Sequence, residues 1–251
     1  LCLDVQGALR EDLRLLVMSA TIDGARVAAL LEDAPVIESE GRAFPVEIRH
    51  RDRAGTEAIE DAMAATIREA LAEETGSILA FLPGQREIHR VAERLEGRVP
   101  AHVVVAPLYG AVEGAAQDLA VRPAPQGTRK IVLATSIAET SLTIDGVRII
   151  VDSGLSRQPV FEPATGLSRL ATVRVSKASA DQRAGRAGRT QAGVAIRLWR
   201  AEQTAALAPF DPPEILAADL SGLVLDCAAW GLADPSELAF LDPPPEPAIT
   251  E

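Results

Sequence analysis

Short apolar runs that alternate with helical patterns are the feature that most limits how this 251-residue chain can fold. The runs SILAFL (77–82), HVVVA (102–106), KIVLA (130–134), VRIIV (147–151) and GVAIRL (193–198) are apolar at nearly every position. Strands that are apolar on both faces are typical of a parallel sheet covered on both sides. Because amphipathic helical patterns separate several of them, the sequence predicts an α/β fold with one parallel sheet and helices on both faces.

The helical patterns fall at residues 57–74, 85–95 and 113–121. In the first of them Thr56 is the expected N-cap, and apolar residues recur at helical spacing. Nearer the N-terminus, LRLLVM at 13–18 predicts one more buried strand. From about residue 212 a single helical stripe and several Asp-Pro turns predict a C-terminal helical segment of a further domain.

Charge is distributed unevenly along the chain. The net charge is −11, yet residues 122–200 hold 13 Lys and Arg against 5 Asp and Glu. A basic stretch within an acidic protein indicates a localised anion site. Cys2 and Cys227 are too few for a disulfide framework, which fits a reducing cytoplasm, and no Cys/His spacing indicates a metal site. No apolar run approaches the roughly 18 residues of a membrane span, so we expect a cytoplasmic protein without a membrane partner.

The run QRAGRAGRT at 182–190 is the strongest candidate for that anion site. If it begins a helix, Gln182, Arg186 and Arg189 follow the i, i+4, i+7 spacing and project from one face. Gly185 and Gly188 add no side-chain bulk, so a phosphate or another backbone can approach closely. Guanidinium groups bind phosphate oxygens in a forked geometry, so the run predicts a phosphate-binding element.

A second polar segment, ATSIAETSLTIDG at 134–146, carries five hydroxyl side chains between two predicted strands. Hydroxyl groups and exposed backbone N–H groups hold phosphates and sugars without reading a base sequence. Taken alone, such a segment is more often a loop that caps the next helix. Its interpretation therefore depends on the arginine run.

Together, QRAGRAGRT and ATSIAETSLTIDG closely resemble motifs VI and V of the DEAH-box helicases of superfamily 2. SAT at 19–21 resembles motif III of that family, and AFLPGQREI at 80–88 resembles motif IV. LYG (108–110), FEPATG (161–166) and PEI (213–215) resemble the bacterial HrpB-like subgroup more narrowly. Four motifs in the family's order make the resemblance specific, and it covers essentially the whole chain.

The resemblance implies a role for each matching residue. Arg186 and Arg189 would be arginine fingers that reach the γ-phosphate of ATP, and Gln182 would lie beside the attacking water. The remaining implied roles are ribose and hydrolytic-site contacts for Ser141, Thr143 and Asp145, RNA-backbone contacts for Gly84, Thr135, Ser136 and Thr140, and coupling of nucleotide state to domain movement for Ser19 and Thr21.

Two helicase motifs are absent from the sequence: it contains no Gly-Lys-Ser/Thr phosphate loop and no Asp-Glu pair. In the family both precede SAT, so we expect the ligands of Mg²⁺, which accompanies ATP, in a preceding domain in cis. The implied domains are the end of a first RecA-like domain (1–43), a second RecA-like domain (44–200) and the start of a winged-helix domain (201–251).

We therefore expect an ATP-dependent RNA helicase of which this chain is the C-terminal part, inactive by itself. Two alternatives remain open from the residues: a non-catalytic RNA-binding module, and a DNA-directed motor of the same superfamily. An RNA-only module has no use for Arg186 and Arg189 aimed at a γ-phosphate, whereas phosphate contacts are common to RNA and DNA.

Overall fold

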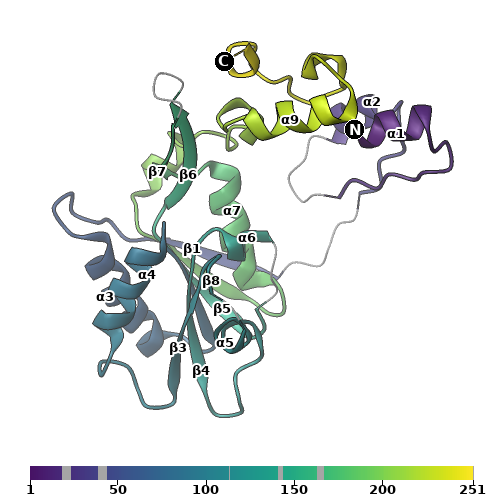
Figure 1. The fold of residues 1–251 in the computed structure, drawn as a ribbon. Coiled ribbons are helices and arrows are strands. Elements are labelled where there is room, and N and C mark those ends of the chain that lie inside the picture. The colour runs from purple at the N-terminus through teal and green to yellow at the C-terminus, as the bar shows by residue number, and fades with distance from the viewer. Residues whose placement is uncertain (19–23, 39–43, 113, 141–143, 163–166, 251) are drawn as a thin grey trace. The chain divides into compact units, whose positions relative to one another are not determined.

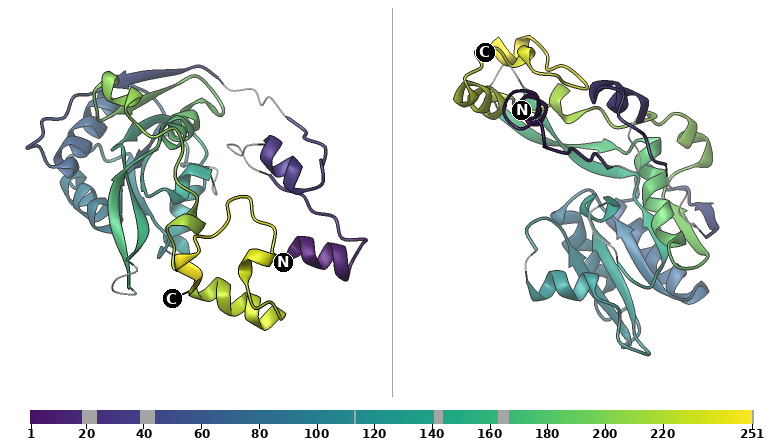
Figure 2. Two further views of the ribbon diagram at one scale, coloured as in Figure 1. Left: turned by 90° about the horizontal axis from the view of Figure 1, so that it is seen from above. Right: turned by 90° about the vertical axis from the view of Figure 1, so that its right-hand side faces the viewer.

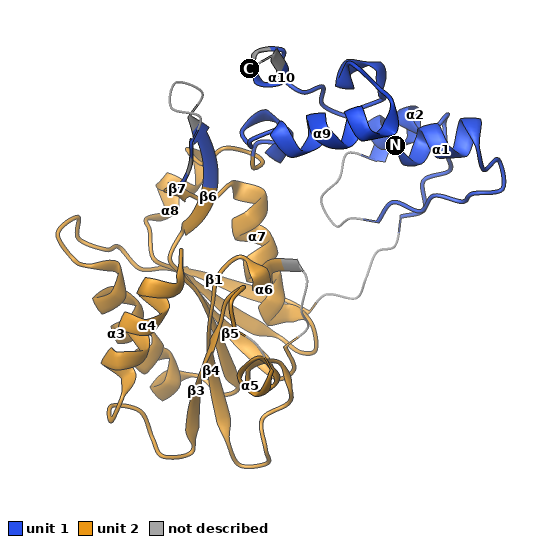
Figure 3. Ribbon diagram, viewed as in Figure 1, with its two compact units in different colours: residues 1–40, 159–170, 212–251 blue, residues 41–158, 171–211 orange. Residues whose placement is uncertain are grey.

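The computed structural model describes residues 1–18, 24–38, 44–112, 114–140, 144–162 and 167–250 (Figure 1). The chain forms two compact units, which Figure 3 colours separately. Unit 1 comprises Leu1–Glu40, Pro159–Leu170 and Pro212–Glu251, and unit 2 comprises Gly41–Gln158 and Ala171–Asp211. The domain boundaries expected from the sequence stay a prediction.

Unit 2 is built on a six-stranded sheet in which every neighbouring pair is parallel. Its strands lie in the order β1-β8-β5-β2-β4-β3. They are β1 (Val46–His50), β2 (Ser77–Phe81), β3 (Val103–Leu108), β4 (Arg129–Ala134), β5 (Val147–Asp152) and β8 (Gly193–Arg197). The predicted parallel α/β fold is confirmed.

Alternation along the central strands divides the core into two layers. In β2, Ile78 and Ala80 pack into one apolar cluster, while Leu79 and Phe81 pack into the other. All of β2 is buried, because successive side chains of a strand point to opposite faces and helices cover both. Burial on both faces explains why the sequences of the central strands are apolar at nearly every position.

Each face of the sheet has its own helices (Figures 1 and 2). α3 (Ile59–Glu73) and α4 (Gln85–Leu95) bury their apolar sides in the first cluster. The second cluster is covered by α5 (Ala115–Val121), α6 (Ile137–Thr140), α7 (Lys177–Gly185) and the 3₁₀ turn η1 (Arg186–Gly188). A short helix, α8 (Ala201–Ala205), follows β8. The predicted N-cap of α3 is wrong: the helix begins at Ile59 with Ala58 as its N-cap, so Thr56 precedes it.

Two features of the sheet region were not predicted from the sequence. β1 lies at the outer end of the sheet, and β6 (Leu155–Glu162) pairs with β7 (Leu167–Arg174) in a separate two-stranded hairpin. Both regions mix charged and apolar residues, because their strands are not covered on two faces. Their sequences therefore lack the continuous apolar runs by which the buried strands were recognised.

Unit 1 contains α1 (Cys2–Ala8), α2 (Gly24–Leu30), η2 (Glu214–Leu216), α9 (Ser221–Trp230), η3 (Pro235–Glu237) and α10 (Pro247–Thr250). Its two terminal segments are joined by polar contacts: Trp230 donates from Nε1 to Asp4 at 2.6 Å. Arg26 likewise pairs with Asp242 at 2.8 Å. The helical prediction for the C-terminal segment is confirmed in α9.

The strand predicted at residues 13–18 is wrong. This segment has no regular secondary structure, and the side chains of Leu16 and Met18 are 79% and 80% exposed. A buried parallel strand needs hydrogen-bonded neighbours on both sides and a covering layer on each face. The described part of unit 1 provides neither for residues 13–18.

Candidate functional site

The arginine run forms the end of α7 and the turn η1. α7 begins at Lys177, where the hydroxyl of Ser176 accepts the N–H of Ser179 at 3.0 Å as an N-cap. The α-helix ends at Gly185, and Arg186 opens a 3₁₀ turn. The run is therefore not one continuous α-helix, and the shared face of Gln182, Arg186 and Arg189 stays a prediction.

The helix carries the run from one end of the sheet toward the other. At its start, the N–H of Val175 donates to the carbonyl of Gly154, which follows β5. At its end, the carbonyl of Gly188 accepts the N–H of Phe44, just before β1, at 2.9 Å. A Cβ on Gly188 would lie 2.5 Å from the carbonyl oxygen of Phe44, so the predicted close backbone approach occurs at this glycine. No such neighbour lies within 4 Å at Gly185.

Arg183, which the sequence reasoning did not single out, is the most buried arginine of the run, with no exposed surface. Its guanidinium pairs with Glu139 at 2.6 Å and with Asp152 at 2.8 Å. It also lies over the ring of Phe81, 4.9 Å from the centroid. Ser179 occupies the other oxygen of Glu139 at 3.0 Å. We name Glu139, Asp152, Ser179 and Arg183 the Arg183 cluster.

A sequence signal for this cluster existed. Ala180, Ala184 and Ala187 form the buried side of α7 and η1, and Arg183 falls within that stripe. A charged residue on a buried helix face requires a partner of opposite charge. Glu139 and Asp152 each follow a strand predicted from the sequence, so they were candidates for the acidic partners of Arg183.

Arg186 has a different environment from Arg183. Its guanidinium donates to the main-chain carbonyl of Glu139. Burial, with a smaller contribution from the like charge of Arg189, lowers the pKa of Arg186 to about 10, against an opposing effect of Glu139. Arg189 is exposed and Gln182 is partly exposed. An anion beside Arg186 and Arg189 would offset their mutual repulsion, so this pair suits a phosphate.

The RNA-contact candidates lie where strands end. Thr135 and Ser136 follow β4, and Gly84 follows β2, which pairs directly with β4. Because the strands are parallel, these residues share the carboxyl end of the sheet, where ligands of such sheets bind. Gly84 is the N-cap of α4, a helix end whose free N–H groups favour anions. The structure therefore brings these three candidates to neighbouring positions.

Gly84 also has a neighbour that the sequence did not suggest. Arg157, from β6, pairs with Glu87 at 3.0 Å. A Cβ on Gly84 would lie 2.3 Å from the Nη1 atom of Arg157. Any side chain at residue 84 would therefore displace this arginine from the start of α4.

The nucleotide-contact candidates are only partly described. Asp145 is exposed and lies in the turn before β5, so it is at the amino end of that strand, away from Thr135 and Ser136. The residues Ser141 and Thr143 and the side chain of Thr140 lie outside the described part of the chain, as do Ser19 and Thr21. In the described ranges, no three His, Cys, Asp or Glu side chains form a group that could hold a metal ion.

The fold and this arrangement define a class: residues 61–191 match the model of the helicase conserved C-terminal domain, and the chain belongs to that family. Within it, the chain is similar to DEAH/RHA helicases of the HrpB type. It is 51% identical over 98% of its length to the "ATP-dependent RNA helicase HrpB" of Escherichia coli (strain K12), of which it covers 30%. It is also 38% identical to the "Pre-mRNA-splicing factor ATP-dependent RNA helicase prp22" of Schizosaccharomyces pombe, over 94% of this chain and 21% of the relative.

Solved structures agree with this assignment. The crystal structure of the Escherichia coli DEAH/RHA helicase HrpB has a TM-score of 0.93 and 50% identity, over 98% of this chain and 32% of that chain. The expected RecA-like fold and family are confirmed. The chain spans about a third or less of the length of these relatives. Among the described helices, none is long and apolar enough to cross a membrane.

Proposed function

We propose that this chain is the C-terminal part of an ATP-dependent RNA helicase that moves along or unwinds RNA. In this proposal Arg186 and Arg189 stabilise the charge that develops on the γ-phosphate of ATP, and Gln182 orients the attacking water. Phosphoryl transfer depends on positioning and charge stabilisation, which arginines supply without covalent chemistry.

One observation carries the proposal: Glu139 holds two of the three arginines of the run, Arg183 and Arg186. Its carboxylate pairs with Arg183, and its main-chain carbonyl accepts a hydrogen bond from Arg186. Glu139 lies in α6, which directly follows Thr135 and Ser136. A shift of this segment on RNA would therefore be transmitted to Arg186 through direct contacts, which supports coupling of RNA binding to hydrolysis.

The proposed ligand contacts divide between the two ends of the sheet. RNA phosphates would bind at the carboxyl end, through Gly84, Thr135, Ser136 and Thr140. The ribose and the hydrolytic site of the nucleotide would lie near Ser141, Thr143 and Asp145. Ser19 and Thr21 would couple nucleotide state to domain movement.

The partner required is a first RecA-like domain in cis. That domain would hold Mg²⁺ and the phosphates of ATP, since this chain contains no Gly-Lys-Ser/Thr sequence. Arg186 and Arg189 fit the anionic end of such a nucleotide because burial and, to a smaller extent, the charge of Arg189 lower the pKa of Arg186, and an anion would offset both effects. Alone, the 251-residue chain should hydrolyse no ATP, with or without RNA.

The test is Arg186→Ala in the longer protein that carries this chain together with a phosphate-loop domain. Loss of an arginine finger should reduce RNA-stimulated hydrolysis by about 10³ to 10⁵. RNA binding, measured by fluorescence anisotropy without nucleotide, should stay unchanged. Arg98→Ala, which removes an exposed arginine before β3, is the matched control and should keep full turnover. Full turnover in Arg186→Ala would show that this arginine does not act on the phosphate.

A further inference from the structure

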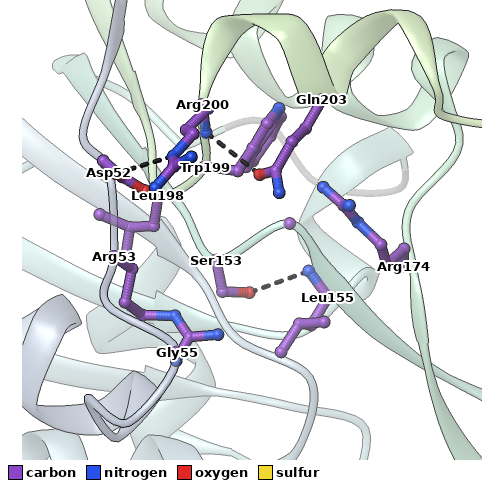
Figure 4. Close-up of a pocket in the computed structure, with 11 residues that line it drawn as sticks. Asp52, Arg53, Gly55, Ser153, Leu155, Arg174, Leu198, Trp199, Arg200 and Gln203 are labelled. Carbon is purple, nitrogen blue, oxygen red and sulfur yellow. Dashed lines mark hydrogen bonds and ion pairs between the residues drawn. The ribbon is translucent and has the colours of Figure 1, made fainter.

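A pocket of ≈ 540 Å³ lies in unit 2, outside the motif segments discussed above (Figure 4). It is formed where three strands end: Asp52 and Arg53 follow β1, Ser153 follows β5, and Trp199 and Arg200 follow β8. Arg174, the last residue of β7, completes it. Its volume is within the range of small-ligand sites, roughly 300 to 1,000 Å³. None of its lining residues belongs to the motif segments 80–88, 134–146 or 182–190.

The lining is strongly basic. Among its eleven residues, Arg53, Arg174 and Arg200 carry positive charge, and Asp52 is the one acid. Arg53 and Arg174 border opposite sides of the pocket in Figure 4, with Ser153 between them. Arginines that converge on one cavity repel each other unless an anion lies between them. The net charge of this pocket therefore favours an anionic ligand.

Most donors of these arginines are not used by the protein. Arg200 pairs with Asp52 through Nε at 2.8 Å, and Arg53 donates from Nη1 to the carbonyl of Glu57. These contacts orient two of the guanidinium groups and leave further N–H donors on each. Among the described residues, the side chain of Arg174 makes neither an ion pair nor a hydrogen bond. The pocket thus holds unused donors of the kind that bind phosphate in a forked manner.

Trp199 is the aromatic residue of the pocket, and its packing bears on the kind of ligand that the pocket can bind. Trp199 is 4% exposed, and its indole N–H donates to Thr204 at 3.0 Å. A Cβ on Gly154 would lie 2.8 Å from the indole ring, so the ring is packed against that backbone. A base cannot stack on a ring face that is covered in this way. With that ring face closed to a stacking base, the arginines are the groups of this pocket best suited to bind a ligand, and they favour a phosphate.

We propose that this pocket is a second phosphate-binding site, which uses Arg53, Arg174 and Arg200 as its donors. The phosphate comes from one of two sources, a free phosphate compound or the phosphodiester of a nucleic-acid strand. The proposal goes beyond the helicase activity proposed above and does not depend on it, because inorganic pyrophosphate alone can test it.

The experiment measures binding to the 251-residue chain carrying Arg186→Gln and Arg189→Gln, so that the motif arginines do not contribute. Pyrophosphate is titrated by calorimetry, and a short oligouridylate by fluorescence anisotropy at several salt concentrations. Adding Arg174→Ala removes charged hydrogen bonds and should weaken binding of the true ligand about tenfold. For the oligouridylate, the slope of log affinity against log salt should also fall by about 0.7 for each lost phosphate contact.

Arg98→Ala in the same background removes one exposed positive charge at the opposite end of the sheet and should change neither titration. Weakening of pyrophosphate alone would identify a free phosphate compound as the ligand, and weakening of the oligouridylate alone would identify a strand. Arg53→Lys, which keeps the charge but not the fork, should give a smaller loss in the same titration. If Arg174→Ala behaves like Arg98→Ala in both titrations, or if neither probe binds, the proposal is overturned.

These outcomes are distinct from those that test the helicase. If Arg174→Ala changes nothing while Thr135→Ala weakens oligouridylate binding, the pocket proposal fails and the proposed function stands. If pyrophosphate binding depends on Arg174 while no oligonucleotide binds, the pocket proposal stands and RNA binding by this chain fails.

Discussion

Arg183 and Arg186 are three positions apart in one sequence run, and their surroundings shift their pKa values in opposite directions. Burial opposes the charge of Arg183, but the carboxylates of Asp152 and Glu139 outweigh it and raise the pKa of Arg183 above its ordinary value. Burial and the nearby charge of Arg189 instead lower the pKa of Arg186 to about 10. The carboxylates around Arg183 favour its charged form, whereas burial and the charge of Arg189 disfavour the charged form of Arg186.

This difference assigns a structural role to Arg183 and a ligand-binding role to Arg186, although both belong to the same nine-residue run. A buried charge with two carboxylate partners cannot also serve a ligand, because its donors are already used. A charge that its surroundings compensate poorly gains most from an incoming anion, and perturbed groups of this kind gather at functional sites. The change from α7 to η1 between Gly185 and Arg186 directs the two arginines into these different environments.

The largest expected effect is that of Arg183→Met on stability. This change leaves the carboxylates of Glu139 and Asp152 in the core without their cation, and breaking a buried pair costs about 3 to 5 kcal/mol. Urea unfolding of the 251-residue chain, followed by circular dichroism, measures the change in free energy. Arg186 is also buried, but its guanidinium donates to the main-chain carbonyl of Glu139 and not to the carboxylate in that hydrogen bond, so Arg186→Met should cost less than Arg183→Met. Equal losses in the two variants would remove the distinction between these arginines.

An intermediate effect is expected for Glu139→Gln. The amide keeps the shape of the side chain but weakens the charged hydrogen bonds to Arg183, while Asp152 still partners the arginine. We expect a loss of about 2 kcal/mol in the same unfolding experiment. Asp118→Asn is the matched control, since Asp118 pairs with Arg122 at the surface and such pairs contribute under about 1 kcal/mol. If the Glu139→Gln variant is as stable as this control, Asp152 alone accounts for the stabilisation of the buried Arg183 charge.

The sequence was sufficient for the elements whose environment is uniform. β2, β4 and β5 are covered on both faces, so their apolar runs alone predicted them, and α4 was predicted with the bounds it has. Residues 13–18 carry the same apolar signal without neighbours to pair with in the described chain, and the strand prediction failed there. The local sequence pattern shows which side chains of a segment are suited to burial. Whether they are buried depends on the neighbouring elements of the fold.

The sequence named residues of the candidate site but did not predict the contacts that these residues make. The motif resemblance selected Arg186 and Arg189, and helical spacing predicted one face shared with Gln182, but the change from α-helix to 3₁₀ turn at Arg186 was not predicted. Arg183 was missed because its role depends on Asp152, which is 31 positions away. Contacts of that separation are set by the strand order, which local spacing does not encode.

The smallest expected effect, a pH dependence, extends the comparison to Lys130, a buried cation that contacts no carboxylate among the described residues. Nζ of Lys130 donates to the carbonyls of Leu119 and Ala120 at 3.1 and 2.8 Å, at the end of α5. Burial lowers the pKa of Lys130 below its ordinary value of 10.5, against an opposing effect of Asp145. Between the lowered native pKa and 10.5, the unfolded chain holds a proton that the native state has released. The free energy of unfolding therefore rises with pH in that window.

This slope should be absent in Lys130→Met, so the stability difference between wild type and variant should grow as the pH is raised from neutral toward 10. One proton limits the slope to about 1.4 kcal/mol per pH unit. Arg183→Met should show no such divergence from wild type, because the pKa of Arg183 is raised and its proton is retained in both states throughout this range. Urea titrations at a series of pH values measure all three proteins. Parallel curves for wild type and Lys130→Met would mean that the carbonyls at the end of α5 compensate the charge of Lys130 as completely as carboxylates compensate that of Arg183.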